Sequence, residues 1–338
     1  MLFNYDDDAA TDYYYCNAAM RAEAHLFANI PAHITVTTLL TVFGTVALDT
    51  TRTPFRTETR ILGGAATFAS ISASMFSRTS IVAAVGSDMP AEHLDSIRAK
   101  GIDTAGIVTV QGGKTFHYDS SFDYDLSNRT TNKTELGVIA GFEPVIPEHY
   151  AKSDYVYLAN NDPQQNIKIL KHFDGPKMVV CDTIEFWIHG DRQGVVDMIG
   201  KTDGVVINDN EARLLCKEAN LARCAKKILS WGARFVIIKK GEHGAIMFAS
   251  DGSVFPASAF FLDEIVDPTG AGDSFAGGFL GHLARAGRLD FASMKEAVIY
   301  GNVMGSFAVE DFGVRRLLSL EQQDVENRFA KYRSLVQF

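Results

Sequence analysis

The sequence predicts a three-layer α/β/α domain with a mainly parallel central sheet and a small β lid. From Asp154 onward, short β-rich segments alternate with helical stretches, which is typical of a parallel sheet covered on both faces. The segments near 51–61 and 113–138 are different, because they alternate polar residues with Thr, Tyr and Phe. Half-exposed strands have this pattern, so we expect these segments to form the separate small sheet.

The chain is expected to begin with an N-terminal extension over residues 1–37 and to fold over residues 38–338. The first segment contains Asp6-Asp7-Asp8 and Tyr13-Tyr14-Tyr15 and lacks a strand–turn–helix rhythm. A variable extension is the main interpretation, and an arm that contacts a partner or a second copy is the alternative.

The folded part starts with the apolar run Leu39 to Phe43, which ends at Gly44 and predicts a buried first strand. Residues 64–76 are rich in Ala and Ser and predict a tightly packed helix, followed by a strand over 79–85. The later strands are expected near 155–158, 177–181, 204–207 and 235–238, and helices over 271–286, 292–309 and 320–335 end the chain.

Composition excludes several classes of protein. With 46% hydrophobic and 22% charged residues, the 338-residue chain has ample material for a core and is not disordered as a whole. The net charge of -9 and the lack of a Lys/Arg cluster argue against a nucleic-acid partner. No apolar run approaches the roughly 20 residues that span a bilayer, and the acidic start is unlike a leader peptide, so a cytoplasmic location is expected.

The four cysteines and nine histidines do not suggest disulfides or zinc. The cysteines have neither a C-x-x-C pair nor the spacing of a disulfide framework, which indicates reduced thiols. The histidines show no metal-ligand spacing.

The stretch from Asp267 to Asp273 carries the strongest chemical signal. Gly270 and Gly272 allow a turn whose backbone N–H groups, including that of Ala271, converge at the start of a helix, and this arrangement binds anions. A carboxylate in such a cradle opposes phosphate binding unless it has a task. Asp273 is therefore a candidate general base for an attacking hydroxyl, and the alternative is a first-turn capping carboxylate.

This stretch resembles the second signature of the ribokinase-like (PfkB) carbohydrate kinase family, with its Gly-Ala-Gly-Asp core intact. The resemblance extends from about Leu39 to Gly313. It implies a ribokinase-like fold, ATP and Mg²⁺ as cofactors, and transfer of a phosphoryl group to a hydroxyl of a small sugar or sugar-like metabolite. Asp273 would act as the general base, and the amides from Gly270 through Ala271 and Gly272 would stabilise the transferred charge.

On the substrate side, the resemblance gives Asp49 the role of holding substrate hydroxyls, although an Asp after a strand is commonly a turn residue. Gly63 and Gly64 resemble the first family signature, where backbone approaches substrate closely, and a structural hinge is the alternative. The family often has Asn where this chain has Ala47 and Phe68. Phe68 could be core, or it could line a pocket wall that meets an apolar or aromatic part of the substrate.

On the nucleotide side, the run from Asn208 to Glu211 matches the family's Asn-x-x-Glu motif, which orders metal-bound water, so magnesium is expected through the phosphates and Glu211. A helix N-cap with Glu at N3 uses the same spacing and could coexist with that role. The other candidates on this side are Lys239, Gly241 and Gly244, in the strand-to-turn element that meets ATP in the family, and Asn302, which borders the adenine in the family. The alternatives are a solvated lysine pair at 239–240 and an ordinary helix-surface Asn at 302.

Two weaker sets of candidate residues follow from the resemblance. Asp267, Thr269 and Ser306 stand where family members often build a potassium site, so K⁺ is a further expected cofactor. Asp182 and Trp187 only partly resemble the family's Asp-x-Asn element and rank low.

Three functions remain open at this stage. The main hypothesis is an ATP-dependent carbohydrate kinase, and the first alternative is a nucleoside kinase of the adenosine type, which Phe68 modestly favours. A catalytically silent ligand-binding regulatory protein is the third, but the intact acidic cradle argues against it. No P-loop string is present. The expected partner is a small sugar or nucleoside, with no nucleic acid and no membrane, and a homodimer is left open.

Overall fold

The computed structural model describes residues 39–126 and 129–337. The expected N-terminal extension lies outside these residues.

The large sheet has nine strands in the order β13-β12-β11-β10-β9-β8-β1-β4-β5. All strands from β11 to β5 in this order pair in parallel, whereas β12 pairs antiparallel with both β11 and β13. The strands are β1 (Leu39–Phe43), β4 (Arg78–Gly86), β5 (Asp103–Val110), β8 (Tyr155–Leu158), β9 (Met178–Cys181), β10 (Gly204–Asn208), β11 (Phe235–Lys239), β12 (Ala245–Ala249) and β13 (Val254–Ala257).

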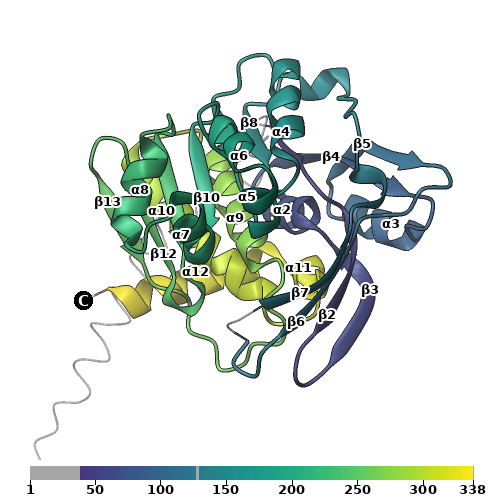
Figure 1. The fold of residues 1–338 in the computed structure, drawn as a ribbon. Helices are drawn as coiled ribbons and strands as arrows, with labels where there is room; N and C mark the ends of the chain where they lie inside the picture. Colours follow the sequence, from purple (N-terminus) through teal and green to yellow (C-terminus); the bar gives the residue numbers. More distant parts are fainter. Residues whose placement is uncertain (1–38, 127–128, 338) are drawn as a thin grey trace, which may run out of the picture. The chain divides into compact units, whose positions relative to one another are not determined.

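Helices cover both faces of this sheet (Figure 1). One hydrophobic cluster packs the first face against α2 (Ala65–Ser74), α3 (Ala91–Ala99), α9 (Ala271–Ala286), α10 (Phe291–Ala308), α11 (Arg315–Ser319) and α12 (Gln322–Val336). A second cluster packs the other face against α4 (Pro163–Ile169), α5 (Glu185–Gly190), α6 (Arg192–Ile199), α7 (Asp209–Cys216) and α8 (Leu221–Leu229). Successive strand residues alternate between the clusters, as with Val206 and Ile207.

Four further strands form the small sheet, in the order β3-β2-β6-β7. They are β2 (Ala47–Arg52), β3 (Thr57–Gly63), β6 (His117–Phe122) and β7 (Arg129–Glu135). In Figure 1 this sheet stands beside the large one, at the lower right. The predicted three-layer domain with a second small sheet is therefore confirmed.

The segment predicted near 51–61 belongs to the small sheet, but a turn divides it between the end of β2 and the start of β3. Thr53 N–H donates to Arg56 O (2.9 Å), and the Thr53 hydroxyl accepts from Arg56 N–H (3.2 Å). Pro54 lies inside this turn and cannot donate a ladder hydrogen bond. Strand β6 likewise starts at His117, four residues after the predicted segment does, since Gly112 (φ 72°) and Gly113 form a turn before it.

The sequence reading did not identify α3, β5 or the antiparallel β12–β13 pair. The hairpin had a usable signal, because Asp251-Gly252 stands between two apolar segments and Gly252 has φ 92°. The sequence signal for strand β5 was weaker, because Gly106 interrupts its pattern of β-forming residues.

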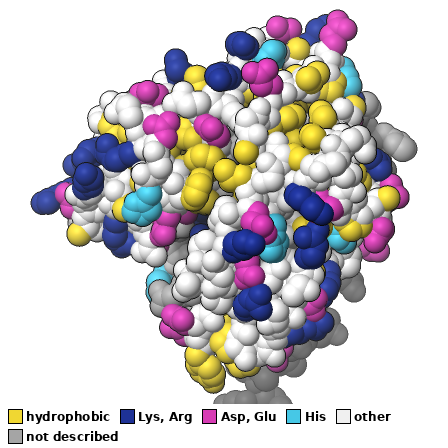
Figure 2. Space-filling view, turned by 45° about the vertical axis from the view of Figure 1, so that its right-hand side comes forward, with side chains coloured by type: hydrophobic (Ala, Val, Ile, Leu, Met, Phe, Trp, Pro, Cys, Tyr) yellow, Lys and Arg dark blue, Asp and Glu magenta, His cyan; other side chains and the backbone are white. Residues whose placement is uncertain are grey.

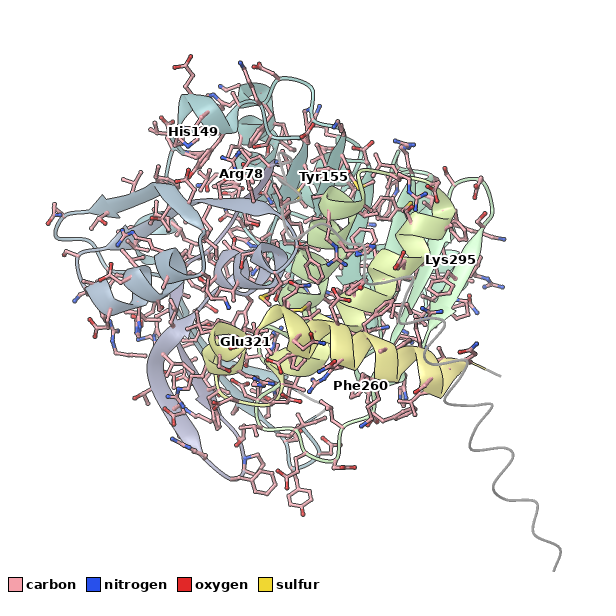
Figure 3. The ribbon with its side chains drawn as sticks, turned by 180° about the vertical axis from the view of Figure 1, so that it is seen from behind. Arg78, His149, Tyr155, Phe260, Lys295 and Glu321 are labelled. Atoms are coloured by element: carbon pink, nitrogen blue, oxygen red, sulfur yellow. The ribbon has the colours of Figure 1, made fainter. Side chains whose placement is uncertain are left out.

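Charges on the face shown in Figure 2 are mixed, with Lys and Arg side chains beside Asp and Glu. Within the small sheet Arg52 pairs with Asp119, and Arg60 of that sheet pairs with Asp88, which follows β4, both at 2.9 Å. Within residues 39–126 and 129–337, no helix combines the length and apolarity needed to cross a membrane. Viewed from behind, α12 runs across the domain from near Glu321 (Figure 3).

Candidate active site

A cleft of about 310 Å³ lies at the carboxyl ends of the parallel strands. Strands β9, β10 and β11 each end at a residue that lines the cleft or lies next to one, and β8 ends two residues before Asn160, which lines it. Open α/β sheets bind ligands at this edge. The small sheet supplies a further wall through Phe116, Tyr118 and Arg129. The sequence candidates that line the cleft are Asp49, Gly64, Phe68, Asn208, Glu211, Lys239, Gly241, Gly244, Thr269, Gly270, Ala271, Gly272, Asp273 and Asn302.

Helix α9 begins at the cleft, and its N-cap residue Gly270 has φ 75°. A Cβ on Gly270 would lie 2.3 Å from the Phe68 ring, and one on Gly272 would lie 2.7 Å from Lys239 Nζ. Gly270 therefore requires glycine, because of both its positive φ and the fixed ring, whereas a Cβ on Gly272 would have to displace the Lys239 ammonium group. The first N–H groups of a helix have no intrahelical acceptor, so this turn presents donors and the positive end of the helix dipole to the cleft.

Asp273 lies in the first turn of α9. Burial and the nearby Asp182 carboxylate raise the pKa of Asp273 to about 7, although Lys239 and Arg129 oppose the rise. A carboxylate that titrates near neutral pH is well matched to accept a proton from a hydroxyl group.

Asp49 is held against the glycine pair. Gly64 N–H donates to Asp49 Oδ2 (3.1 Å), and a Cβ on Gly63 would lie 2.0 Å from that same oxygen. Burial raises the pKa of Asp49 to about 7, and the Asp267 and Asp273 charges add to the rise. Its Oδ1 atom has no hydrogen-bond partner in the described structure. Gly63 itself does not line the cleft and acts by leaving room for Asp49.

The ring of Phe68 is 1% exposed and belongs to the first core cluster. Phe68 is also among the residues that line the cleft, and its ring lies against Gly270 there. The structure therefore favours the core interpretation of Phe68 over that of a stacking wall.

Asn208 and Glu211 form a reciprocal N-cap of α7. The Asn208 side chain accepts from Glu211 N–H (2.8 Å), and Glu211 Oε2 accepts from Asn208 N–H (3.0 Å). Both residues also line the cleft, so capping coexists with a place in the site. Burial and the Asp182 charge raise the pKa of Glu211 to about 8, against the opposing effect of Lys239.

The strand-to-turn element after β11 requires its second glycine. Gly244 has φ 79°, and a Cβ there would lie 2.0 Å from Ala257 O. Asn302 of α10 faces the same end of the cleft and donates to Ser258 O (2.9 Å).

The three residues predicted to bind potassium have different surroundings in the structure. Asp267 is fully buried and accepts from Thr269 N–H (2.9 Å) and Gly313 N–H (3.3 Å). The Ser306 hydroxyl instead donates to Val303 O and accepts from Arg328 Nη1 (3.1 Å). A guanidinium at that distance disfavours a second cation, so Ser306 does not fit the expected site.

The cleft residues that sequence reasoning missed or ranked low include four polar or aromatic ones, namely Tyr118, Arg129, Asn160 and Asp182. The β alternation around Tyr118 predicts a strand but not which face turns to the cleft. Asp182 and Asn160 carry a usable signal, since each follows a buried parallel strand. Trp187 packs against the second core cluster instead.

The site suits a nucleotide polyphosphate better than a metal held by protein alone. No group of three or more His, Cys, Asp or Glu side chains within residues 39–126 and 129–337 is placed to hold a metal. Mg²⁺ commonly binds through one or two carboxylates and substrate phosphates, and Glu211 beside the α9 turn fits that donor set.

Residues 37–321 match the model of the pfkB family carbohydrate kinases. The chain is 29% identical over 255 residues to the cytidine kinase of Thermococcus kodakarensis, covering 74% of this chain and 90% of the relative. Its fold is similar to that of the Methanocaldococcus jannaschii nucleoside kinase, with a TM-score of 0.70, 20% identity and coverage of 87% and 98%. It is also similar to a putative ribokinase II from E. coli in complex with ATP and Mg²⁺, with a TM-score of 0.69, 18% identity and coverage of 87% and 99%.

Proposed function

This chain belongs to the pfkB family of carbohydrate kinases, and from that premise we propose that it transfers the γ-phosphoryl group of ATP to a ribose hydroxyl of a nucleoside. The broader expectation, an ATP-dependent kinase of a small sugar or nucleoside, is confirmed by the family match and by the kinase relatives. A catalytically silent family member is therefore not the favoured hypothesis.

The observation that carries the nucleoside proposal is the mixed lining of one cleft. Asp49 offers carboxylate oxygens to vicinal hydroxyls, and the rings of Phe116 and Tyr118 line the same cleft from the small sheet. A nucleoside carries both a diol and a flat apolar base, whereas a simple sugar carries only hydroxyls. The 29% identity to a cytidine kinase points the same way.

In the proposed mechanism, Asp49 accepts hydrogen bonds from the ribose hydroxyls and orients the attacking oxygen. Asp273 accepts the proton of that oxygen as it bonds to the γ-phosphorus, and ADP leaves with the electron pair of the broken P–O bond. The N–H groups at the start of α9 and the ammonium group of Lys239 stabilise the negative charge of the transferred group.

Magnesium, when bound with ATP, would neutralise phosphate charge, and Glu211 is the carboxylate that would hold its water ligands. We propose that the small sheet acts as a lid over the cleft. Its closure would exclude water, which competes with the substrate hydroxyl for the phosphoryl group.

A phosphorylation screen tests this function. The purified chain would be incubated with MgATP and a panel of nucleosides, pentoses, hexoses and hexose phosphates, and ADP release and phosphorylated product would be measured. We expect the highest kcat/KM for a nucleoside. A sugar that outcompetes every nucleoside would contradict the nucleoside assignment and leave the kinase standing.

We also propose a monovalent cation site at Asp267 and Thr269, without Ser306. Asp267 is buried, and no Lys or Arg within residues 39–126 and 129–337 forms an ion pair with it, so a bound cation would balance its charge. Replacing K⁺ by a bulky organic cation should therefore lower kcat. Equal rates in the two buffers would argue against the site.

A further inference from the structure

Lys239 projects from the end of β11 to the start of α9. Its side chain is only 14% exposed, and its Nζ atom lies so close to Gly272 that a Cβ there would be 2.7 Å away. The ammonium group thus occupies the edge of the turn whose N–H groups face the cleft. A single methylene chain with four rotatable bonds does not hold such a position without a partner.

That partner is Asp182, which follows β9. Asp182 Oδ2 lies 3.1 Å from Lys239 Nζ, and the carboxylate is 6% exposed. Two other groups fix the carboxylate itself. The Tyr157 hydroxyl donates to Oδ2 (3.2 Å), and Thr183 N–H donates to Oδ1 (2.7 Å).

Several carboxylates surround the Lys239 ammonium group, so its position depends on which of them it contacts. Burial alone would lower the pKa of Lys239, but Asp182, Glu211 and Asp273 raise it above its ordinary value. Lys239 is therefore a charged group surrounded by carboxylates, and Asp182 is the one that meets it within hydrogen-bond distance. The direction of the ammonium group depends on that contact.

We propose that Asp182 is a positioning residue for phosphoryl transfer, which holds the Lys239 ammonium group at the N-terminal turn of α9. Tyr157 in turn orients Asp182. This inference rests on the proposed kinase function and extends it to two residues that do not touch the transferred group. Preorganised charge of this kind stabilises the transition state because it needs no rearrangement during the reaction.

A double-mutant cycle tests the proposal. We expect Lys239→Met to lower kcat by about 100-fold, the scale of losing one preorganised donor, and Asp182→Asn to lower it by about 10-fold. The cycle is measured at about pH 9, where Asp273 is deprotonated in every variant and the effect of Asp182 on its pKa of about 7 no longer matters. If Asp182 then acts through Lys239, the double variant should be no slower than Lys239→Met. The KM of the nucleoside should change little in all three variants, since the effect is on the phosphoryl side.

Tyr157→Phe gives a second route if Asp182→Asn does not fold. It removes one hydrogen bond to a charged acceptor and should lower kcat by about fivefold. Tyr155→Phe is the matched control, because Tyr155 lies on the same strand, is buried in the same core cluster and donates to Leu283 O rather than to the site (Figure 3). We expect its kcat to equal that of the wild type.

Thermal unfolding separates positioning from a purely structural role. If Asp182→Asn folds and keeps the wild-type kcat while only its Tm falls, this inference is overturned and the proposed function stands. The same holds if the losses in kcat of the two single variants multiply in the double variant. A wild-type chain that phosphorylates neither sugars nor nucleosides would overturn the proposed function and this inference with it.

Discussion

The Asp273 carboxylate sits among groups that bind anions, and its electrostatic setting explains how it could serve there. Burial and Asp182 disfavour its charged form, whereas Lys239 and Arg129 favour it. The balance raises its pKa to about 7, so the proton affinity of this carboxylate is close to neutral pH.

We expect Asp273→Asn to lower kcat by at least about 100-fold, because a positioned general base contributes on that scale. The affinity for ATP should stay close to that of the wild type, since the amide keeps the shape of the carboxylate and removes a negative charge near the phosphates. Steady-state kinetics and titration calorimetry with MgATP measure the two effects. Near-normal turnover would contradict the role of Asp273 as base.

Phe68 gives a second prediction at the residue scale. Its ring is 1% exposed and lies against Gly270, so removing it leaves a cavity beneath the α9 turn. Phe68→Ala should reduce the free energy of unfolding by about 3–5 kcal/mol, as large-to-small core changes do. The KM of the nucleoside should change little in the protein that remains folded. A large rise in KM without loss of stability would show instead that the ring contacts substrate.

At the scale of elements, the motifs that could be predicted are those at the ends of parallel strands. Asn208, Lys239 and the α9 turn each have a local signature, because a strand, a turn and a helix follow one another in sequence. The parallel sheet then brings them to one edge.

The cleft residues of the small sheet lacked such a signature. An alternating pattern predicts that a segment is a strand. Which face of that strand lies toward the cleft depends on how β2, β6 and β7 pair. Strand β2 pairs parallel with β6, a partner more than 60 residues away. Tyr118 and Arg129 therefore became visible only in three dimensions, as did the role of Gly63 in leaving space for Asp49.

Tyr118 of β6 tests the small sheet as a substrate wall. Its hydroxyl contacts Thr131 (2.7 Å) and its ring lies 5.5 Å from the Arg129 guanidinium, so the ring is held in place at the cleft. Tyr118→Ala should raise the KM of a nucleoside by about 5- to 150-fold, matching the roughly 1–3 kcal/mol that an aromatic platform gives one base.

Tyr118→Phe is the control for this prediction, because it keeps the ring and removes only the hydroxyl. Its KM for the nucleoside should remain near the wild-type value. Equal KM values in the Ala, Phe and wild-type proteins would argue that the base does not lie against this ring.

At the scale of the whole molecule, the buried carboxylates of the site should make stability and activity depend on pH in opposite directions. Burial first, and neighbouring carboxylates second, raise the pKa of Asp49 and Asp273 to about 7 and that of Glu211 to about 8. In the unfolded chain such groups titrate near pH 4. Between about pH 4 and pH 8 the folded chain therefore binds more protons than the unfolded chain, and its free energy of unfolding falls as pH rises.

Activity should change in the opposite direction, because the base must be deprotonated to accept a proton. We expect kcat/KM to rise as pH increases through about 7 while the Tm of the ligand-free protein falls from pH 5 to pH 8. Asp273→Asn carries no such charge, so its Tm should exceed that of the wild type at pH 8 by more than at pH 5. Thermal unfolding of both proteins across this range measures the effect. A Tm difference that does not depend on pH would mean that Asp273 titrates at its ordinary value, and the site would then lack the buried charge from which its proton affinity is argued to come.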